Sequence, residues 1–465
     1  MRKTAAAITV ILMLLAAAVS VHAVTIEAGR IRSFDDNILT VTSEDGGRLT
    51  IEAVSGTIPL ENPVTDLPVE GGTVEVHWNG LTFDGEPLPA GEITLRALLA
   101  GNDLTTEVAE IRRAVDSPMP AVLCCLPVTR EFYANGKNVL KIECAVSGRG
   151  TYEISIARKD NPHESIWYNR AVYSGRGTPI VFRWDGKNKN HKVCEPGEYI
   201  ISAWSSYRSE YVQTAELILL PEPLPEPELT VTGNLIPDDL TDDTAVWETL
   251  MTPVAVGEGP EGKGLKIMNA KGGRECIGTV SCRTVGVAVL ELFDDGWAKI
   301  GAWRQTDGVY IEGYVKTSKL RMIRPNTRYG AVVDKKKQTI TVYENGKRLG
   351  TAMVSTGYTT DEDRTADTHS GVYLLGTRLD AFATDGHTYV YPIRLERLNL
   401  IHQMGYEMKN GGRDFSAEME TLGTKASHGC VRVDARITEE NNGINAWWIW
   451  THMGHDTKII VTPED

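Results

Sequence analysis

Residues 338–357 read QTITVYENGKRLGTAMVSTG, and this stretch decides the class of fold in the last third of the chain. Ile340 and Val342 alternate with polar residues, and this period of two is typical of a strand with one buried face. The tetrapeptide ENGK at 344–347 is a strong signal for a tight hairpin turn, because asparagine and glycine accept the positive φ angles that such turns require. The residues after the turn return as a second strand. The stretch therefore predicts a β-hairpin.

Further segments around this hairpin also have strand character. They are short apolar runs bounded by turn residues, at 328–333, 368–373, 389–393, 400–402 and 456–461. One helix is expected at 439–453, where Trp447, Trp448 and Trp450 cluster and are expected to pack in the core. Residues 326–463 are therefore predicted to form a mostly β domain.

An internal repeat marks the first half of the chain. The segments HWNG and RWDG place Trp78 and Trp184 at the end of a strand and before a tight turn. The spacing from Trp78 to Gly91 equals that from Trp184 to Gly197, where a second alternating strand begins. The repeat predicts two β-sandwich modules, at residues 24–115 and 116–220. Their Trp-Asp-Gly and Pro-Gly-Glu-Tyr elements resemble the Ig-like domain of the flagellar-hook capping protein, and we interpret both tryptophans as core or turn anchors.

Two more regions separate the sandwiches from the last domain. Residues 221–262 are rich in proline and acidic residues, which predicts an extended, semi-rigid linker. Residues 263–322 predict a small β-barrel. Its strand order GLKIM, GWAKI and GYV resembles bacterial SH3-like domains, which often bind cell-wall peptides. A spacer domain with Trp297 in its core is the alternative.

The N-terminus predicts export. Arg2 and Lys3 precede an apolar run at 5–21, and the VHA that ends at Ala23 is typical of a signal-peptide cleavage site. We therefore interpret residues 1–23 as a signal peptide, with retention as an uncleaved anchor as the alternative. No second apolar run of that length follows, so no membrane span is expected after signal removal. The mature protein is expected to be extracytoplasmic, secreted or wall-associated, and periplasmic in a two-membrane envelope.

The net charge of the chain is −14, which argues against a nucleic-acid partner because phosphate binding requires clustered Lys and Arg. The chain has seven cysteines, and an odd number in an exported protein leaves at least one thiol for reaction. Cys276 and Cys282 are expected to form a local disulfide, and the four cysteines between 124 and 194 one or two more. Cys430 is then the remaining thiol. The alternative is that several cysteines are buried free thiols.

The segment SHGCVR at 427–432 carries the candidate chemistry. Acyl transfer needs a nucleophile, a base within hydrogen-bond reach and donors for the oxyanion. The Cys430 thiolate is the candidate nucleophile. His428 shares a face with Cys430 in an extended segment, whereas His402 ends a predicted strand where its ring is held rigidly. These two histidines therefore compete for the role of base.

The order of segments across 326–463 resembles the catalytic domain of L,D-transpeptidases, the YkuD domain. The matching segments are ENGK, the VSTG return, THSGVY, IH and SHGCVR. The resemblance implies packed sheets with an active-site groove, and a cysteine acyl-enzyme that cross-links or trims peptidoglycan stem peptides. It implies neither a cofactor nor a metal.

The resemblance also implies a role for each matching residue. His402 is the base, and His428 orders the turn or contacts substrate. Gly429 permits a tight turn whose N–H groups, with that of Cys430, face the oxyanion. Arg432 orders the loop or receives a substrate carboxylate. Ser427 and Tyr391 are the remaining expected substrate contacts.

The sequence departs from the family pattern at one place. More residues separate His402 from Ser427 than is usual, and the insertion falls in 405–418. His369 and His387 are therefore the fallback bases. Zinc held by His402, His428 and Cys430 is a further alternative, with no fourth ligand at a conventional spacing.

The sequence therefore predicts a mainly β, multidomain, exported L,D-transpeptidase that remodels peptidoglycan by acyl transfer between stem peptides, through 3-3 crosslinking or a related exchange. The rival hypothesis is a catalytically inactive wall-binding or adhesive protein. The sequence does not indicate an oligomeric state.

Overall fold

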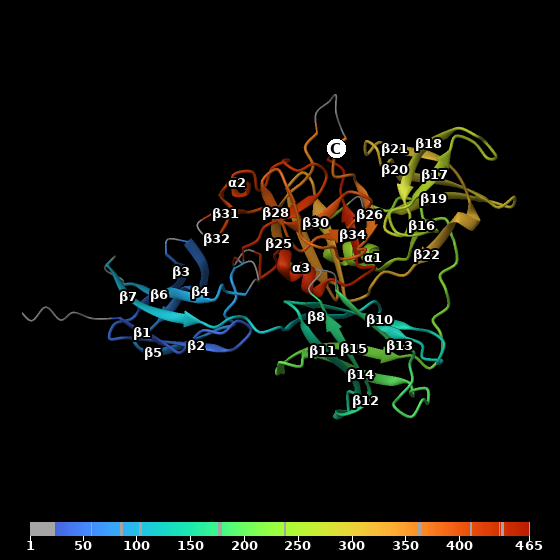
Figure 1. The fold of residues 1–465 in the computed structure, drawn as a ribbon. Coiled ribbons are helices and arrows are strands. Elements are labelled where there is room, and N and C mark those ends of the chain that lie inside the picture. The colour runs from blue at the N-terminus through green and yellow to red at the C-terminus, as the bar shows by residue number, and fades with distance from the viewer. Residues whose placement is uncertain are drawn as a thin grey trace, which may run out of the picture. The chain divides into compact units, whose positions relative to one another are not determined.

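The computed structural model describes residues 24–464, apart from 57, 84–86, 102–104, 175–178, 237–238, 360–364, 410–411, 437 and 439–440. The predicted signal peptide lies outside the described residues. The described chain is mostly strand with three short α-helices, so the mainly β, multidomain class is confirmed (Figure 1). No helix in this described part combines the length and the apolar character that crossing a membrane requires.

The chain divides into two compact units, and the first comprises residues up to 31, 36–78 and 91–115. Its sheets have the orders β1-β2-β5 and β4-β3-β6-β7, and every pairing within them is antiparallel. The strands are β1 (Thr25–Ala28), β2 (Asn37–Ser43), β3 (Gly47–Ser55), β4 (Ile58–Val69), β5 (Gly72–Trp78), β6 (Gly91–Ala100) and β7 (Thr106–Val115). Buried and less buried residues alternate along β6, as expected for a strand with one face on the core.

The second unit begins, apart from two short segments, at residue 116, and its first part is another pair of sheets. Their orders are β13-β10-β8 and β12-β11-β14-β15-β9. The strands are β8 (Val122–Pro127), β9 (Glu131–Phe132), β10 (Leu140–Val146), β11 (Gly150–Arg158), β12 (Asn161–Tyr173), β13 (Ile180–Trp184), β14 (Gly197–Ser205) and β15 (Arg208–Leu219). Both sheets contribute to one hydrophobic cluster that includes Ile142, Tyr152 and Trp184.

The repeat has the same local conformation in both copies. Trp78 and Trp184 are buried at the ends of β5 and β13, as expected for core anchors. The turns that follow contain Gly80 at φ 65° and Gly186 at φ 79°, a region that favours glycine.

A helix and a strand lie within the stretch predicted to be an extended linker. Helix α1 (Asp243–Met251) is capped by the Asp242 carboxylate, which accepts from the N–H groups of Thr244 and Ala245. Strand β16 (Val254–Gly257) is fully buried and pairs with β19 and β22. The folded module therefore begins near residue 254 rather than 263. The sequence prediction missed this start because the acidic N-cap and the short apolar run stand in a stretch whose composition is typical of a linker.

We call residues 254–323 the β16–β22 module. Its sheet has the order β18-β17-β21-β20-β19-β16-β22. The remaining elements are β17 (Gly264–Met268), β18 (Cys276–Ser281), β19 (Gly286–Phe293), β20 (Trp297–Trp303), β21 (Tyr310–Lys316), the 3-10 turn Thr317–Lys319 and β22 (Leu320–Ile323).

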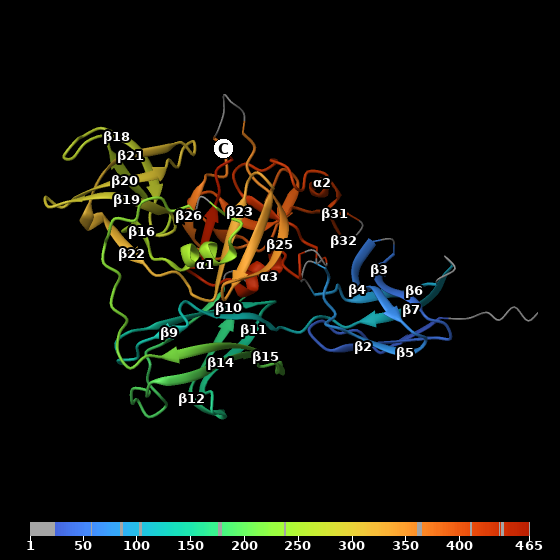
Figure 2. The same ribbon diagram turned by 180° about the vertical axis from the view of Figure 1, so that it is seen from behind.

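The C-terminal domain is built on an eight-stranded sheet of order β26-β34-β23-β24-β25-β33-β30-β29. Figure 2 labels β23, β25 and β26 of this sheet. Its strands are β23 (Tyr329–Asp334), β24 (Thr339–Glu344), β25 (Lys347–Ser355), β26 (Gly371–Leu374), β29 (Ile393–Arg394), β30 (Leu400–Gln403), β33 (Val431–Val433) and β34 (Lys458–Val461). The smaller elements are β27 (Phe382–Thr384), β28 (His387–Tyr389), β31 (Glu407–Lys409), β32 (Gly412–Asp414), α2 (Ser416–Met419) and α3 (Ala446–His452).

The predicted hairpin is confirmed, because β24 and β25 pair antiparallel around Asn345 and Gly346, both at positive φ. The predicted helix is shorter than expected. It begins at Ala446, since the Asn445 side chain caps it, and a turn with Asn442 and Gly443 at positive φ precedes it. Residues 439–440 lie outside the described residues.

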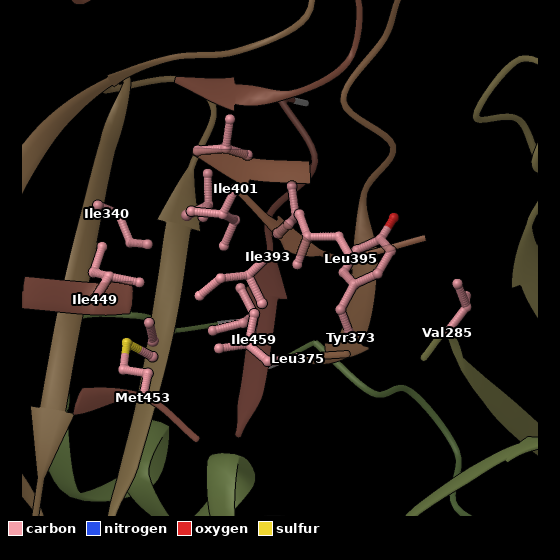
Figure 3. Close-up of a cluster of buried hydrophobic side chains, with 14 of the residues drawn as sticks. Val285, Ile340, Tyr373, Leu375, Ile393, Leu395, Ile401, Ile449, Met453 and Ile459 are labelled. Atoms are coloured by element: carbon pink, nitrogen blue, oxygen red, sulfur yellow. The ribbon is translucent and has the colours of Figure 1, made fainter. Parts of the chain in front are cut away.

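One hydrophobic cluster joins the β16–β22 module to the C-terminal sheet. Figure 3 shows Ile340, Ile401 and Ile459 pointing toward one another, with Tyr373 and Val285 to one side. Val285 and Tyr373 form a β-bridge, and the Leu374 N–H donates to the Thr284 carbonyl at 2.8 Å. The module and the C-terminal domain therefore share a core.

Candidate active site

Two neighbouring parallel strands, β30 and β33, bring the candidate residues together. Their register pairs His402 with Arg432, and Ile401 with Val431. Cys430 directly precedes β33, two residues before Arg432. Because side chains alternate across a strand, Cys430 and Arg432 share the face on which His402 lies.

Cys430 sits at the end of a closed, hydrogen-bonded turn. The Ser427 hydroxyl donates to the Cys430 carbonyl at 2.5 Å, and the Gly429 N–H donates to the Ser427 oxygen at 3.2 Å. The Thr368 hydroxyl donates to the Gly429 carbonyl at 2.9 Å. Ser427 therefore shapes the turn rather than facing a substrate, and the Gly429 N–H is already engaged rather than open to an oxyanion.

Gly429 is needed at its position for two reasons. Its φ of +113° is a conformation that other residues rarely adopt. A Cβ there would also lie 2.4 Å from Asn399 Oδ1. This turn therefore tolerates no side chain at residue 429.

The Cys430 thiol is free and partly exposed. It donates to the Leu398 carbonyl across 3.9 Å. Burial raises the pKa of this thiol, while the Leu400 N–H and the charge of Arg432 act in the opposite direction. At neutral pH the thiol is therefore protonated, and nucleophilic attack requires a base.

His402 is the buried imidazole on the neighbouring strand, with 2% of its surface exposed. Burial lowers the pKa of His402 to about 4, helped by the Arg432 charge and opposed by the hydrogen bond to the Gln403 carbonyl. That bond joins Nδ1 to the carbonyl oxygen at 2.6 Å. Because a carbonyl only accepts, Nδ1 carries the proton and Nε2 is the basic nitrogen.

Aromatic rings enclose this imidazole. Phe382 and Tyr389, from the β27–β28 hairpin, meet the His402 ring edge-on at centroid distances of 5.4 and 4.9 Å. The two rings stack on each other at 5.2 Å. The enclosure excludes water from His402, which explains why its neutral form is favoured.

Arg432 is held by the segment that the sequence marked as an insertion. Its Nη1 lies 2.9 and 3.0 Å from the two carboxylate oxygens of Glu418. The Tyr389 hydroxyl donates to the same carboxylate at 3.2 Å, and the guanidinium lies over the Tyr389 ring at 5.3 Å. Of the two expected roles for Arg432, the geometry favours ordering the loop. Sequence reasoning missed Glu418, because nothing near it in the chain points to Arg432.

An ionic network lies on the other side of the Cys430 turn. His369 Nδ1 is 2.8 Å from Glu396 Oε1, and the Asn399 amide donates to the same oxygen at 2.7 Å. Lys335 and Asp367 form a buried ion pair at 3.0 Å. Sequence reasoning named only His369 of this network, as a fallback base.

The remaining expected residues lie elsewhere. His428 is exposed. Tyr391 is buried, and its ring packs against Trp447 and Trp450 at 5.1 and 5.4 Å, so it belongs to the core rather than to a groove. His387, the second fallback base, accompanies Glu407 at 3.7 Å.

The expected disulfides do not form, because all seven cysteines are free. Cys276 is exposed whereas Cys282 is buried, so the local bridge between them was a wrong prediction. Among the described residues, no group of three or more His, Cys, Asp or Glu side chains is arranged to hold a metal ion. The zinc alternative therefore finds no support.

Comparison with known proteins identifies the last domain. Residues 328–461 match the family YkuD, the L,D-transpeptidase catalytic domain. No curated protein matches the chain.

Three solved structures illustrate the structural similarity. An L,D-transpeptidase from Xylanimonas cellulosilytica is 19% identical with a TM-score of 0.21, over 29% of this chain and 60% of that chain. An L,D-transpeptidase from Mycobacterium smegmatis is 15% identical with a TM-score of 0.24, over 46% of this chain and 100% of that chain. Dimeric latent PorU from Porphyromonas gingivalis is 11% identical with a TM-score of 0.22, over 42% of this chain and 19% of that chain. The chain therefore spans less than two thirds of the length of the first and third of these structures.

Proposed function

We propose that this chain is an exported L,D-transpeptidase that acts on peptidoglycan stem peptides with Cys430 as the nucleophile. The observation that carries the proposal is the pairing of β30 with β33 inside the YkuD segment. This pairing sets the neutral imidazole of His402 beside Arg432, two residues after the free thiol of Cys430, and that proximity supports the proposal. The signal-peptide pattern at 1–23 supports an extracytoplasmic location.

The first half-reaction makes an acyl-enzyme. His402 Nε2 accepts the Cys430 proton as the sulfur attacks the carbonyl that precedes the terminal D-residue of a donor stem tetrapeptide. The C–S bond forms, the oxyanion collapses, and the amine of the D-residue leaves with the proton from His402. Because the thiol pKa is raised and the imidazole pKa is lowered, the resting pair is neutral, so proton transfer accompanies the attack.

The second half-reaction transfers the acyl group. An acceptor amine, which the family implies is the side chain of a diamino acid, attacks the thioester and gives its proton to His402. The Cys430 thiolate leaves and is reprotonated. We assign the oxyanion contact to the Cys430 N–H, since the Gly429 N–H is engaged by Ser427. The product is a 3-3 crosslink or the result of a related exchange.

A carbapenem tests the nucleophile directly. Mass spectrometry of the folded protein after incubation should show one adduct, and peptide mapping should place it on Cys430. The Cys276→Ser variant is the matched control, because Cys276 is an exposed thiol outside the site and its loss should leave the adduct unchanged. A Cys430→Ala variant that forms the same adduct, or that processes muropeptides like wild type, contradicts the proposal.

A wall-binding protein without turnover is the second candidate, and the longer gap between His402 and Ser427 favours it. A pull-down on purified peptidoglycan separates the two hypotheses. Retention on the wall by the unmutated protein with no turnover of muropeptides supports the second candidate, and turnover excludes it.

A further inference from the structure

The short segment 396–399 forms one wall of the Cys430 turn. The Leu398 carbonyl accepts from the thiol, and Asn399 fills the space that Gly429 leaves open. The charge of Glu396 raises the pKa of Cys430. The position of this segment therefore sets the surroundings of the sulfur.

This segment has little burial of its own at its tip. Leu398 is 77% exposed, and the segment is held internally by the Asn399–Glu396 hydrogen bond and by two N–H groups that donate to the Asn399 carbonyl. Glu396 and Asn399 at its two ends are buried, whereas the exposed tip has few buried contacts that resist displacement. Its geometry therefore depends on contacts from outside the segment.

The β16–β22 module supplies the first such contact. The Arg397 N–H donates to the hydroxyl of Ser281 at 3.1 Å, and Ser281 is fully buried at the end of β18. The Gln305 amide donates to the same hydroxyl at 3.0 Å, which fixes its orientation. This hydrogen bond therefore fixes the backbone of the segment to the module at Arg397, the residue before Leu398.

The turn at 304–309 of the module supplies the second contact. Gly308 has φ +64°, and a Cβ at this position would lie 2.7 Å from His369 Cδ2 and 3.0 Å from Asp367 Oδ2. The module backbone therefore packs directly on the imidazole that accompanies Glu396. Asp307, whose pKa Arg304 lowers, also lies close enough to His369 to interact with it electrostatically.

We propose that the β16–β22 module is a working part of the active site, with Ser281 and the 304–309 turn as positioning elements for Cys430. The inference rests on the proposed function, in which Cys430 is the nucleophile. Neither element contacts the thiol or a reacting atom. They act through segment 396–399 and His369, and the shared core around Val285 and Tyr373 holds the module rigidly enough to do so.

The test compares two glycines of the same module. Gly308→Ala introduces a methyl group against His369. Gly272→Ala is the matched control, because Gly272 has φ +70° and its Cβ would meet nothing within 4 Å. Both variants carry a similar backbone strain, so a difference between them reports the contact with His369.

The readout is the alkylation rate of Cys430 by iodoacetamide, measured by peptide mapping over a range of pH. The exposed Cys276 thiol serves as an internal reference. The charged groups that face Cys430 are Arg432 and Glu396, and those that face His369 are Glu396, Asp367 and Asp307. We expect Gly308→Ala to shift the pH profile of Cys430 and to lower turnover by about 10-fold to 100-fold, as small misplacements of reacting groups do. Gly272→Ala should match wild type in both respects.

A folded Gly308→Ala protein whose Cys430 profile matches that of Gly272→Ala overturns the proposal. If Gly308→Ala does not fold, the Ser281→Ala variant is the decisive test, because it removes the hydroxyl that accepts from Arg397 and from Gln305. A changed Cys430 profile in that variant with an unchanged Cys276 rate supports the proposal, and an unchanged Cys430 profile overturns it. Alkylation needs no turnover, so a failure of the proposed function would appear separately, as absence of activity in wild type.

Discussion

The Cys430 turn lies between two regions that each enclose a histidine in a different way. On the aromatic side, Phe382 and Tyr389 surround His402. On the ionic side, His369 lies against Glu396, near the Lys335–Asp367 pair. Both rings are buried, but the partner of Nδ1 differs, because His402 has a backbone carbonyl there and His369 has the Glu396 carboxylate. Burial alone therefore does not single out the proposed base; its position on β30, beside β33, does.

The largest expected effect is the loss of the base on the aromatic side. His402→Gln keeps a polar group of similar reach but cannot take the Cys430 proton. We expect turnover of a stem tetrapeptide to fall by about 10²-fold to 10⁴-fold, the usual contribution of a general base. His163→Gln, at an exposed position on β12, is the control and should behave like wild type. A loss of less than about three-fold in His402→Gln would make another group the base.

The buried ion pair on the ionic side is expected to contribute to the free energy of unfolding. Lys335→Met leaves the buried Asp367 without its ion-pair partner, which costs about 3–5 kcal/mol in comparable cases. Urea unfolding of the variant should show this loss. The double variant Lys335→Met with Asp367→Leu should recover much of it, and a double variant as unstable as the single one would show that the ion pair is not the cause.

Acidification should lower the stability of the fold through His402, the buried ring on the aromatic side. The folded pKa of His402 is about 4, whereas an unfolded histidine titrates near 6.5, so between these values the unfolded state binds more protons. The contribution of neutral His402 to stability is fully present above about pH 6.5 and is lost as the pH falls toward about 4, with a total of about 3 kcal/mol. Unfolding free energies measured across this range should fall less steeply in His402→Gln. Equal slopes for both proteins would contradict the burial of an uncharged ring.

The smallest expected effect comes from the inserted segment. Glu418→Gln removes the charge that neutralises Arg432, and the uncompensated guanidinium then disfavours the protonated His402 further. We expect kcat to fall by about 10-fold with little change in KM, as for one charge-assisted hydrogen bond in a partly buried site. Glu420→Gln, two residues further on and exposed, is the matched control. Equal kinetics in the two variants would show that Arg432 does not need Glu418.

Local patterns in the sequence predicted those structural features that depend on residues close together in the chain. The ENGK turn predicted the β24–β25 hairpin, and Trp78 and Trp184 marked strand ends that are buried as expected. The Ser-His-Gly-Cys segment and the Ile-His strand predicted that Cys430 and His402 belong to one site. In the structure His402 pairs with Arg432, two residues after Cys430, and a common site for the two residues stays a prediction.

Contacts between residues that are far apart in the sequence left no local pattern from which they could be predicted. Glu418 reaches Arg432 from an insertion, and Ser281 reaches Arg397 from another module. Tyr391 was expected in the groove, but its burial depends on Trp447 and Trp450, which only the folded chain brings near it. Helix α1 was missed because its Asp242 cap stands in an acidic stretch that reads as linker. Cysteine counting failed for a different reason, since Cys125 and Cys144 do lie opposite each other on β8 and β10 and are nevertheless free thiols.

Trapping the acyl-enzyme tests the central claim most directly. Wild-type protein is mixed with a stem tetrapeptide, quenched in acid and mapped by mass spectrometry, beside His402→Gln. The account predicts a thioester on Cys430 whose mass corresponds to the donor without its terminal D-residue, with much slower formation in the variant. A folded wild-type protein that releases the D-residue while Cys430 stays unmodified, or a variant that acylates as fast as wild type, would contradict it.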